Sequence, residues 1–208
     1  MLLIYLCPSP SSKVARGDYI LPLDADDKIG KEYLEEAVKI LDENPGIGIV
    51  YCRAEAFGMV NRKWELPEYC LEEMLLDNII FCSGFFRKND WEKVGGYNLQ
   101  MIYGWEDYDF WLSLIELGVL VYRIPKVLFY YRTMPGSMVK SKTKKQKIEM
   151  FTKIFRRHQD LFTKNIDIWI DKLVDDKQDP VAQLLIDTGL GFNEKQTNNK
   201  QGFKILPL

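Results

Sequence analysis

Three aspartates lie close together near the start of the chain, directly after an apolar run. Asp24-Ala25-Asp26-Asp27 follows Tyr19-Ile20-Leu21-Pro22-Leu23. Three carboxylates in four residues repel one another, and a divalent cation at the end of a buried strand would make this arrangement favourable. Mg²⁺ and Mn²⁺ prefer such oxygen ligands, often one or two carboxylates together with substrate phosphates. The cluster therefore indicates a metal that holds a phosphorylated ligand, while a solvated turn that caps the next helix explains the same residues as well.

Two other acidic motifs fit this cluster less well. A calcium-binding EF-hand loop requires glycine at its sixth position, which is Ile29 when the count starts at Asp24. Phosphatases of the haloacid dehalogenase type also have Asp-x-Asp after a strand, but Thr or Val occupies their fifth position, where this chain has Lys28. A phosphatase is therefore the weaker alternative.

A second group of acidic and aromatic residues surrounds Glu106-Asp107. Two carboxylates at the start of a helix suit proton transfer, because the helix end favours one ionised group while burial raises the pKa of the other. The neighbouring aromatic side chains, among them Trp105, would form a wall for a sugar ring. The alternative is an acidic helix start favoured by the helix dipole, with core aromatics behind it.

Two basic features come later in the chain. Arg132 ends an apolar run before Met134-Pro135-Gly136, and its guanidinium matches the oxygens of a diphosphate, although a surface arginine on an edge strand is the better interpretation without context. The lysine-rich stretch 140–147 favours a solvated helix start. Its alternative is contact with an anionic bilayer or a lipid diphosphate.

Strands and helices must position these residues. Apolar patterns predict a strand over 18–23, a helix over 31–43 and a strand over 47–52. A strand-helix-strand unit favours an α/β fold with a mixed, mainly parallel sheet covered by helices. The later expected elements are a hairpin or loop over 53–64, helices over 72–77, 89–94, 108–117 and 144–161, and strands over 79–87, 119–123 and 127–132.

Composition indicates one soluble domain. The 208 residues are 47% hydrophobic and 28% charged, with a net charge of -2, which argues against nucleic acid as a partner. The four cysteines form no C-x-x-C pair, so they are expected to be reduced, and no segment is long enough to span a bilayer. We expect a domain over 1–177, with C-terminal helices from about 144, and a loosely packed polar tail over 178–208.

In order and spacing, these segments resemble the catalytic portion of family 2 glycosyltransferases, which have the GT-A fold. The resemblance extends from about Val14 to Ser141 and rests on the ordered combination of its motifs. The matching stretches are Ala15–Ile20 with Asp24–Asp27, Ser83-Gly84-Phe85-Phe86-Arg87, Gly95-Gly96-Tyr97, Gly104-Trp105-Glu106-Asp107 and the turn Tyr131–Ser137.

The resemblance implies a role for each matching residue. Asp26 would ligate Mn²⁺ or Mg²⁺, and Asp24 would support the metal or lie near the ribose of a nucleotide-diphosphate sugar. Asp107 would be the catalytic base of an inverting transfer to a hydroxyl of a glycan or lipid-linked acceptor. Glu106 would orient the acceptor or the base. The other implied substrate contacts are Ser83, Gly84, Trp105 and Arg132.

The chain departs from the family pattern in two ways. Family members carry a longer nucleotide-binding half before the Asp-x-Asp motif, whereas 23 residues precede Asp24, so the chain looks truncated at its start. Such a sheet would expose an edge, which we expect a homodimer or another chain to cover. Met134 stands near a position where many relatives have a metal-binding histidine, and a thioether is a poor ligand for Mg²⁺ or Mn²⁺.

These departures leave two hypotheses. The leading one is a bacterial enzyme of polysaccharide or glycoconjugate assembly, cytoplasmic and peripheral at the inner membrane. The alternative is a non-catalytic remnant that binds a glycan or a partner chain, because catalysis needs the donor held in a near-attack geometry.

Overall fold

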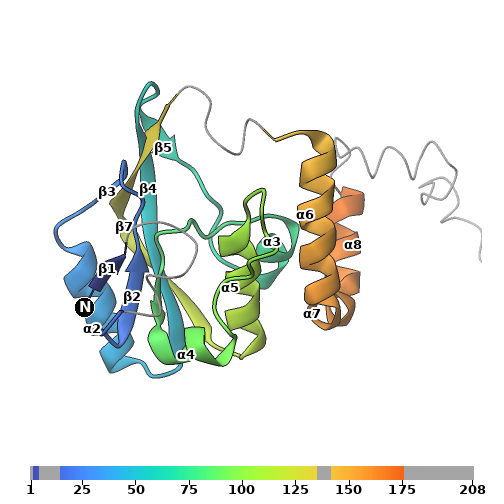
Figure 1. Cartoon of the computed structure of the whole chain (residues 1–208), viewed down its shortest axis with the longest axis horizontal. Helices are drawn as coiled ribbons and strands as arrows, with labels where there is room; N and C mark the ends of the chain where they lie inside the picture. Colours follow the sequence, from blue (N-terminus) through green and yellow to red (C-terminus); the bar gives the residue numbers. More distant parts are fainter. Residues whose placement is uncertain (1, 5–14, 135–141, 176–208) are drawn as a thin grey trace, which may run out of the picture. The chain divides into compact units, whose positions relative to one another are not determined.

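A mixed sheet forms the centre of the fold (Figure 1). The computed structural model describes residues 2–4, 15–134 and 142–175. The strand order is β1-β2-β6-β4-β7-β3, and β5 pairs with β4 outside this path. The strands are β1 (Leu2–Ile4), β2 (Tyr19–Pro22), β3 (Lys28–Ile29), β4 (Ile47–Gly58), β5 (Arg62–Trp64), β6 (Phe85–Arg87) and β7 (Leu120–Thr133).

The sheet is mixed, as the sequence predicts. The pairs β1–β2 and β4–β7 are parallel, and the other pairs are antiparallel. The β4–β7 pair is the longest and continues from Ile47 to Gly58 on the β4 side, so parallel pairing contributes most of the register positions. β1 and the two-residue β3, at opposite edges of the sheet, were not predicted from the sequence.

Helices lie on both faces of this sheet (Figure 1). The helix α2 (Tyr33–Glu43) packs on one face, where the ring of Tyr33 meets that of Phe85 edge-to-face at 5.0 Å. The helix α5 (Glu106–Glu116) packs on the other face, where Phe110 and Trp111 contact Phe86. The helices of this first unit, which ends at Lys164, are α2 (Tyr33–Glu43), α3 (Leu71–Leu76), α4 (Lys88–Lys93), α5 (Glu106–Glu116), α6 (Lys144–Arg157) and α7 (Gln159–Lys164).

A second unit begins at Asn165 and contains α8 (Ile166–Asp175), which was not predicted as a separate helix. The expected polar tail over 178–208 lies outside the described residues. None of the helices in the described ranges is long and apolar enough to cross a bilayer.

The predicted strand over 79–87 is wrong for most of its length, because only Phe85–Arg87 forms a strand. Two backbone carbonyls in the preceding stretch bond to side chains in place of a neighbouring strand. Trp111 Nε1 donates to Ile80 O at 3.1 Å, and Tyr33 OH donates to Ser83 O at 2.8 Å. Residues 79–84 therefore form an irregular segment between α3 and β6.

Among the other boundaries that differ from the expectation, two have a clear physical reason. The strands expected over 119–123 and 127–132 are one strand, β7, whose register against β4 shifts where Ile124 is followed by Val127 as the next paired residue. Pro125 lies in this irregularity, where its missing N–H costs no ladder bond. The helix expected over 144–161 ends at Arg157, and α7 starts after His158, whose side chain is buried and paired with carboxylates.

Candidate functional site

The acidic turn is held between the ends of β2 and β7. Within the turn, the backbone N–H of Asp27 donates to Asp24 O at 3.1 Å. From β7, the backbone N–H of Arg132 donates to Asp27 Oδ1 at 2.7 Å, and Arg132 Nε donates to Asp26 O at 2.8 Å. The predicted contact of Arg132 with a diphosphate stays a prediction, but the structure shows that this arginine fixes the turn.

The carboxylates of the turn are short of compensating partners. Asp27 is 9% exposed, and its second oxygen, Oδ2, is buried without a hydrogen bond. Burial raises the pKa of Asp27 to about 6, and burial followed by the charge of Asp26 raises the pKa of Asp24. Such a group favours a cation, and its oxygen donors suit Mn²⁺ or Mg²⁺. Within the described ranges, however, no group of three or more His, Cys, Asp or Glu side chains is arranged to hold a metal by itself.

Asp107 lies in the first turn of α5, half-buried at the helix N-terminus. Its Oδ1 accepts from the backbone N–H of Tyr108 at 2.8 Å, and its Oδ2 accepts from Asn78 Nδ2 at 3.0 Å. Burial first, and then the adjacent Glu106 carboxylate, raise the pKa of Asp107 to about 7. A carboxylate with this pKa suits general base catalysis near neutral pH.

The turn before α5 is strained. Trp105 has a φ of 64°, the only positive φ at a non-glycine position among the described residues, and it follows Gly104 with a φ of 108°. A left-handed conformation is costly for a bulky side chain and often occurs at functional sites. The ring of Trp105 packs on Phe151 of α6 at 5.4 Å, which holds this conformation in place.

One segment connects the acidic turn to Asp107. Asn78, at its start, donates to Asp107, and the thiol of Cys82 lies 3.9 Å from Asp24 Oδ2. Between them, the carbonyl of Ile80 is fixed by the buried indole of Trp111. The segment 78–82 therefore places the two acidic groups next to the same piece of backbone.

Ser83 and Gly84 extend this segment into the core. Ser83 is fully buried, and its carbonyl accepts from Tyr33 OH. A side chain at Gly84 would place its Cβ 3.2 Å from the ring of Trp111, so glycine allows the segment to lie against the indole. The predicted contacts of Ser83 and Gly84 with substrate stay predictions. In the structure, Ser83 accepts a hydrogen bond from Tyr33, and Gly84 lies against Trp111.

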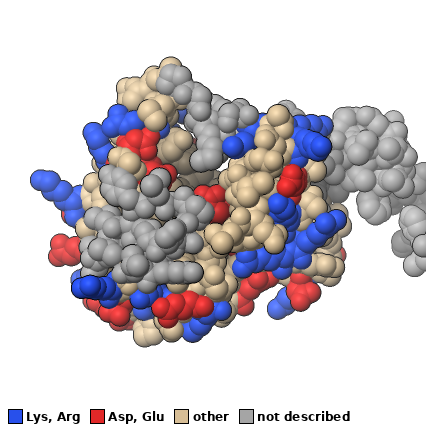
Figure 2. Space-filling model, viewed as in Figure 1, with Lys and Arg blue, Asp and Glu red and all other residues tan. Residues whose placement is uncertain are grey.

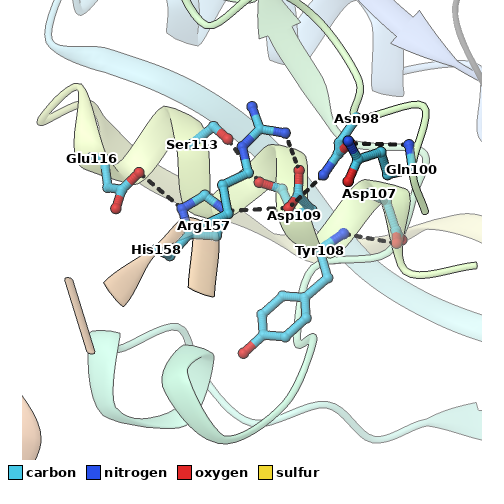
Figure 3. Close-up of polar contacts among 9 residues, drawn as sticks. All are labelled: Asn98, Gln100, Asp107, Tyr108, Asp109, Ser113, Glu116, Arg157 and His158. Carbon is cyan, nitrogen blue, oxygen red and sulfur yellow. Dashed lines mark hydrogen bonds and ion pairs between the residues drawn. The ribbon is translucent and has the colours of Figure 1, made fainter. Parts of the chain in front are cut away.

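A buried charged cluster behind Asp107 was not predicted (Figure 3). Asp109 is fully buried; Arg157 Nη1 donates to its Oδ2 at 2.7 Å, and His158 Nε2 lies 3.5 Å from its Oδ1. His158 Nδ1 is 2.8 Å from Glu116 Oε2. Burial alone would lower the pKa of His158, but its hydrogen bonds to Asp109 and Glu116 raise it. This cluster fastens α6 to the helix that carries Asp107.

Of the site residues that were not predicted, Asp109 has a signal in the sequence and Asn78 has none. Asp109 interrupts an otherwise apolar helix face, which indicates a buried partner without naming it. Asn78 has no recognisable pattern around it. Met134, the departure from the expected histidine, is 53% exposed, and the rest of that turn, 135–137, lies outside the described residues.

Residues 12–102 match the family model described as Glycosyl transferase family 2. This stretch, which is less than half of the chain, is similar to that family. A Haemophilus influenzae protein named as an uncharacterized glycosyltransferase is 31% identical over 147 residues, or 65% of this chain and 50% of that protein. The uncharacterized protein y4gI of Sinorhizobium fredii is 28% identical over 134 residues, or 62% of this chain and 15% of that protein.

The crystal structure of S. aureus TarS 1-349 in complex with UDP-GlcNAc has a similar fold. Its TM-score is 0.51 at 16% sequence identity, covering 79% of this chain and 58% of that chain. At this identity the likeness concerns the fold, and it agrees with the GT-A-like architecture expected from the sequence. The chain spans about half the length of its Haemophilus relative, and the matched family segment ends before Glu106 and Asp107.

Proposed function

We propose that this chain is a family 2 glycosyltransferase and transfers a sugar from a nucleotide-diphosphate sugar to an acceptor hydroxyl with inversion at the anomeric carbon. The observation that carries the proposal is the half-buried Asp107, whose pKa is near 7 and whose hydrogen-bond donor, Asn78, begins the segment that reaches Asp24. The candidate base and the acidic turn therefore both contact one short stretch of backbone, which supports a role for them in one site.

Asp107 acts as the base in this mechanism. Its ionised carboxylate accepts the proton of the acceptor hydroxyl, and the acceptor oxygen forms a bond to the anomeric carbon. The bond from that carbon to the diphosphate oxygen breaks on the opposite face, and the nucleoside diphosphate leaves with the electron pair. Glu106, which lies beside the base, orients the acceptor, and Trp105 offers an aromatic wall to a sugar.

The acidic turn would hold the donor diphosphate. Asp26 and Asp24 are the proposed ligands of Mn²⁺ or Mg²⁺, with diphosphate oxygens completing the coordination shell. The unpartnered Oδ2 of Asp27 supports a cation nearby. When bound, the metal would neutralise the charge that develops on the leaving diphosphate. Arg132 keeps the turn in place through the backbone of Asp26 and the side chain of Asp27.

Calorimetric titration tests the donor site. UDP with excess Mn²⁺ is titrated into the wild type and into Asp26→Ala, with Asp107→Asn as the matched control because it also removes one carboxylate. Binding to the wild type and to Asp107→Asn, together with its loss in Asp26→Ala, supports the proposal. Binding that is unchanged in Asp26→Ala contradicts the assignment of the metal ligand.

A non-catalytic protein that binds a glycan or a partner chain is the second candidate. It is favoured by the absence, among the described residues, of three side chains arranged around a metal, and by methionine at position 134. Absence of UDP binding in the wild type would favour this candidate. The nature of the acceptor, glycan or lipid-linked, is likewise a proposal, and so are a homodimer over the sheet edge and a contact with the membrane.

A further inference from the structure

Helix α6 exposes an apolar stripe. Ile148, Phe151 and Phe155 are 56%, 36% and 40% exposed, and their spacing of three and four residues places them on one side of the helix. Met150 and Ile154, on another side, are buried in the core. Uncharged surface runs along this helix between groups of basic side chains (Figure 2). Within the first unit this stripe is covered only in part, by the contacts of Phe155 with Phe162 and of Phe151 with Trp105, and the exposed fractions show that much of it remains accessible.

Basic side chains surround this stripe. α6 carries six Lys and Arg residues and one acidic residue, Glu149, which pairs with Lys153 at 3.0 Å. Across the described ranges, no acidic side chain lies within ion-pair distance of the exposed Lys144, Lys145, Lys147 or Arg156. The whole chain has a net charge of -2, so this positive charge is local.

The apolar stripe is connected to the candidate base. Phe151 lies 5.4 Å from Trp105 and 6.2 Å from Tyr108, the residues on either side of Glu106-Asp107. The buried ion pair between Arg157 and Asp109 fastens the end of α6 to the same helix. A ligand on the outer face of α6 would therefore lie close to the first turn of α5.

We infer that the outer face of α6 docks on an anionic lipid bilayer. Exposed large apolar side chains with lysines beside them suit insertion into the headgroup region, where apolar burial and attraction to anionic lipids act together. An acidic surface without an apolar layer would leave Ile148 and Phe155 in water. The bilayer is the occupant that satisfies both the stripe and its charge.

Docking on a bilayer would also specify the kind of acceptor. This step rests on the proposed function. A bilayer on α6 holds the N-terminus of α5 at the lipid–water boundary, through the contact of Phe151 with Trp105. An acceptor hydroxyl presented there is the headgroup of a lipid or of a lipid-linked glycan. The inference therefore deepens the proposed reaction from a general acceptor to one anchored in the membrane.

Vesicle sedimentation with the full chain tests the docking. The probes are vesicles of phosphatidylcholine and phosphatidylglycerol in equal parts, and vesicles of phosphatidylcholine alone. We expect binding to the anionic vesicles that weakens as salt increases. Lys145→Glu/Lys147→Glu should weaken it by more than tenfold, because each lost basic residue weakens binding by about fivefold. Ile148→Ser should also weaken binding, by loss of apolar burial.

The control carries the same charge change elsewhere. Lys31→Glu/Lys39→Glu alters two exposed lysines in and just before α2, and it should bind vesicles as the wild type does. Thermal melts show that each variant is folded. Failure of the wild type to bind anionic vesicles, whether because a second copy or another part of the chain covers α6, overturns the inference. So does equal weakening in both double variants.

Sedimentation needs no turnover, so the two proposals fail separately. Transfer to a soluble acceptor without vesicle binding would contradict membrane docking and support the proposed enzyme activity. Vesicle binding without UDP binding would support membrane docking and contradict the proposed donor site.

Discussion

Asn78 Nδ2 donates a hydrogen bond to Asp107 Oδ2 at 3.0 Å, across 29 positions of sequence. This bond opposes the two influences that raise the pKa of Asp107, which are burial and the charge of Glu106. The amide therefore stabilises the ionised carboxylate, the form that a general base requires. It also orients Oδ2 by a donor on a different element from the helix that carries Asp107.

Asn78→Ala should shift the pH dependence of transfer. Loss of a hydrogen bond that lowers the pKa moves the pKa of Asp107 upward from about 7. The acidic limb of the kcat/KM profile should then move to higher pH, and activity at alkaline pH should recover toward the wild-type value. An unchanged profile with uniformly lower activity would contradict the role given to Asn78.

Asp107→Asn should remove transfer and raise stability. A positioned base contributes about 10²–10⁴-fold to rate, and the variant should lose at least that much while it keeps UDP binding. In the wild type, Asp107 has a higher pKa when folded than its ordinary 3.8, so stability falls as pH rises from about 4 to about 7.

Urea unfolding of the wild type and of Asp107→Asn measures the predicted difference in stability. A pKa shift from 3.8 to about 7 corresponds to about 4 kcal/mol. Because Asp107 is only half-buried and solvent screens its charge, we expect the uncharged variant to be more stable than the wild type by about 2 kcal/mol at pH 8. The difference should shrink toward pH 4, where the wild-type carboxyl is protonated. A variant less stable than the wild type at pH 8 would show that the ionised form is not penalised.

Arg157→Ala should destabilise the fold strongly. It leaves the fully buried Asp109 without its guanidinium partner, and removing one partner of a buried pair costs about 3–5 kcal/mol. Because Arg157 itself is partly exposed, we expect the lower end of this range. Adding Asp109→Asn to Arg157→Ala should restore part of the loss in urea unfolding, and a double variant weaker than both single variants would argue against the pairing.

His158→Gln should cost more stability in acid than in base. The pKa of His158 is raised above its ordinary 6.5 in the folded state, so its contribution is complete below that pH and is lost as pH rises through the folded pKa. Thermal melts at pH 6 and pH 9 should show a larger difference between variant and wild type at pH 6. Equal differences would mean that the charged imidazole contributes nothing.

Gly84→Ala should lower the stability of the fold. The added Cβ would come within 3.2 Å of the Trp111 ring, which is fully buried and bonded to Ile80 O. Overpacking of this kind costs about 1–3 kcal/mol. Gly46→Ala is a suitable control, because its Cβ would make an ordinary 3.7 Å contact with Leu120. Comparable melts for the two variants would contradict the close packing at Gly84.

The elements best predicted from sequence are those with a local cause. The strand before Asp24, the helix α2 and the helix α5 follow from apolar runs and periodicity. Asn44-Pro45-Gly46 ends α2, and Gly118 follows the end of α5. The segment 79–84 could not be predicted in the same way. Its residues are apolar and β-prone, but its carbonyls bond to Tyr33 and Trp111, side chains distant in sequence.

The residues of the site also divide into those with a local signal in the sequence and those without one. The acidic turn and the pair Glu106-Asp107 stand out because like charges are adjacent in the chain. Asn78 and Arg157 do not, because their importance comes from partners 29 and 48 positions away. Long-range partners of this kind leave no local spacing to detect.

The length of the segment from Asn78 to Cys82 also limits how far apart the acidic turn and Asp107 can lie. Four residue steps span at most about 14 Å of backbone, so the acidic turn and the base are held at a separation that the chain length limits. An inserted residue would lengthen that reach by about 3.5 Å, far beyond the tolerance of a reacting geometry. The loop between β4 and β5 is not part of this segment. A change in the length of that loop therefore does not alter the limit on the distance between the acidic turn and Asp107.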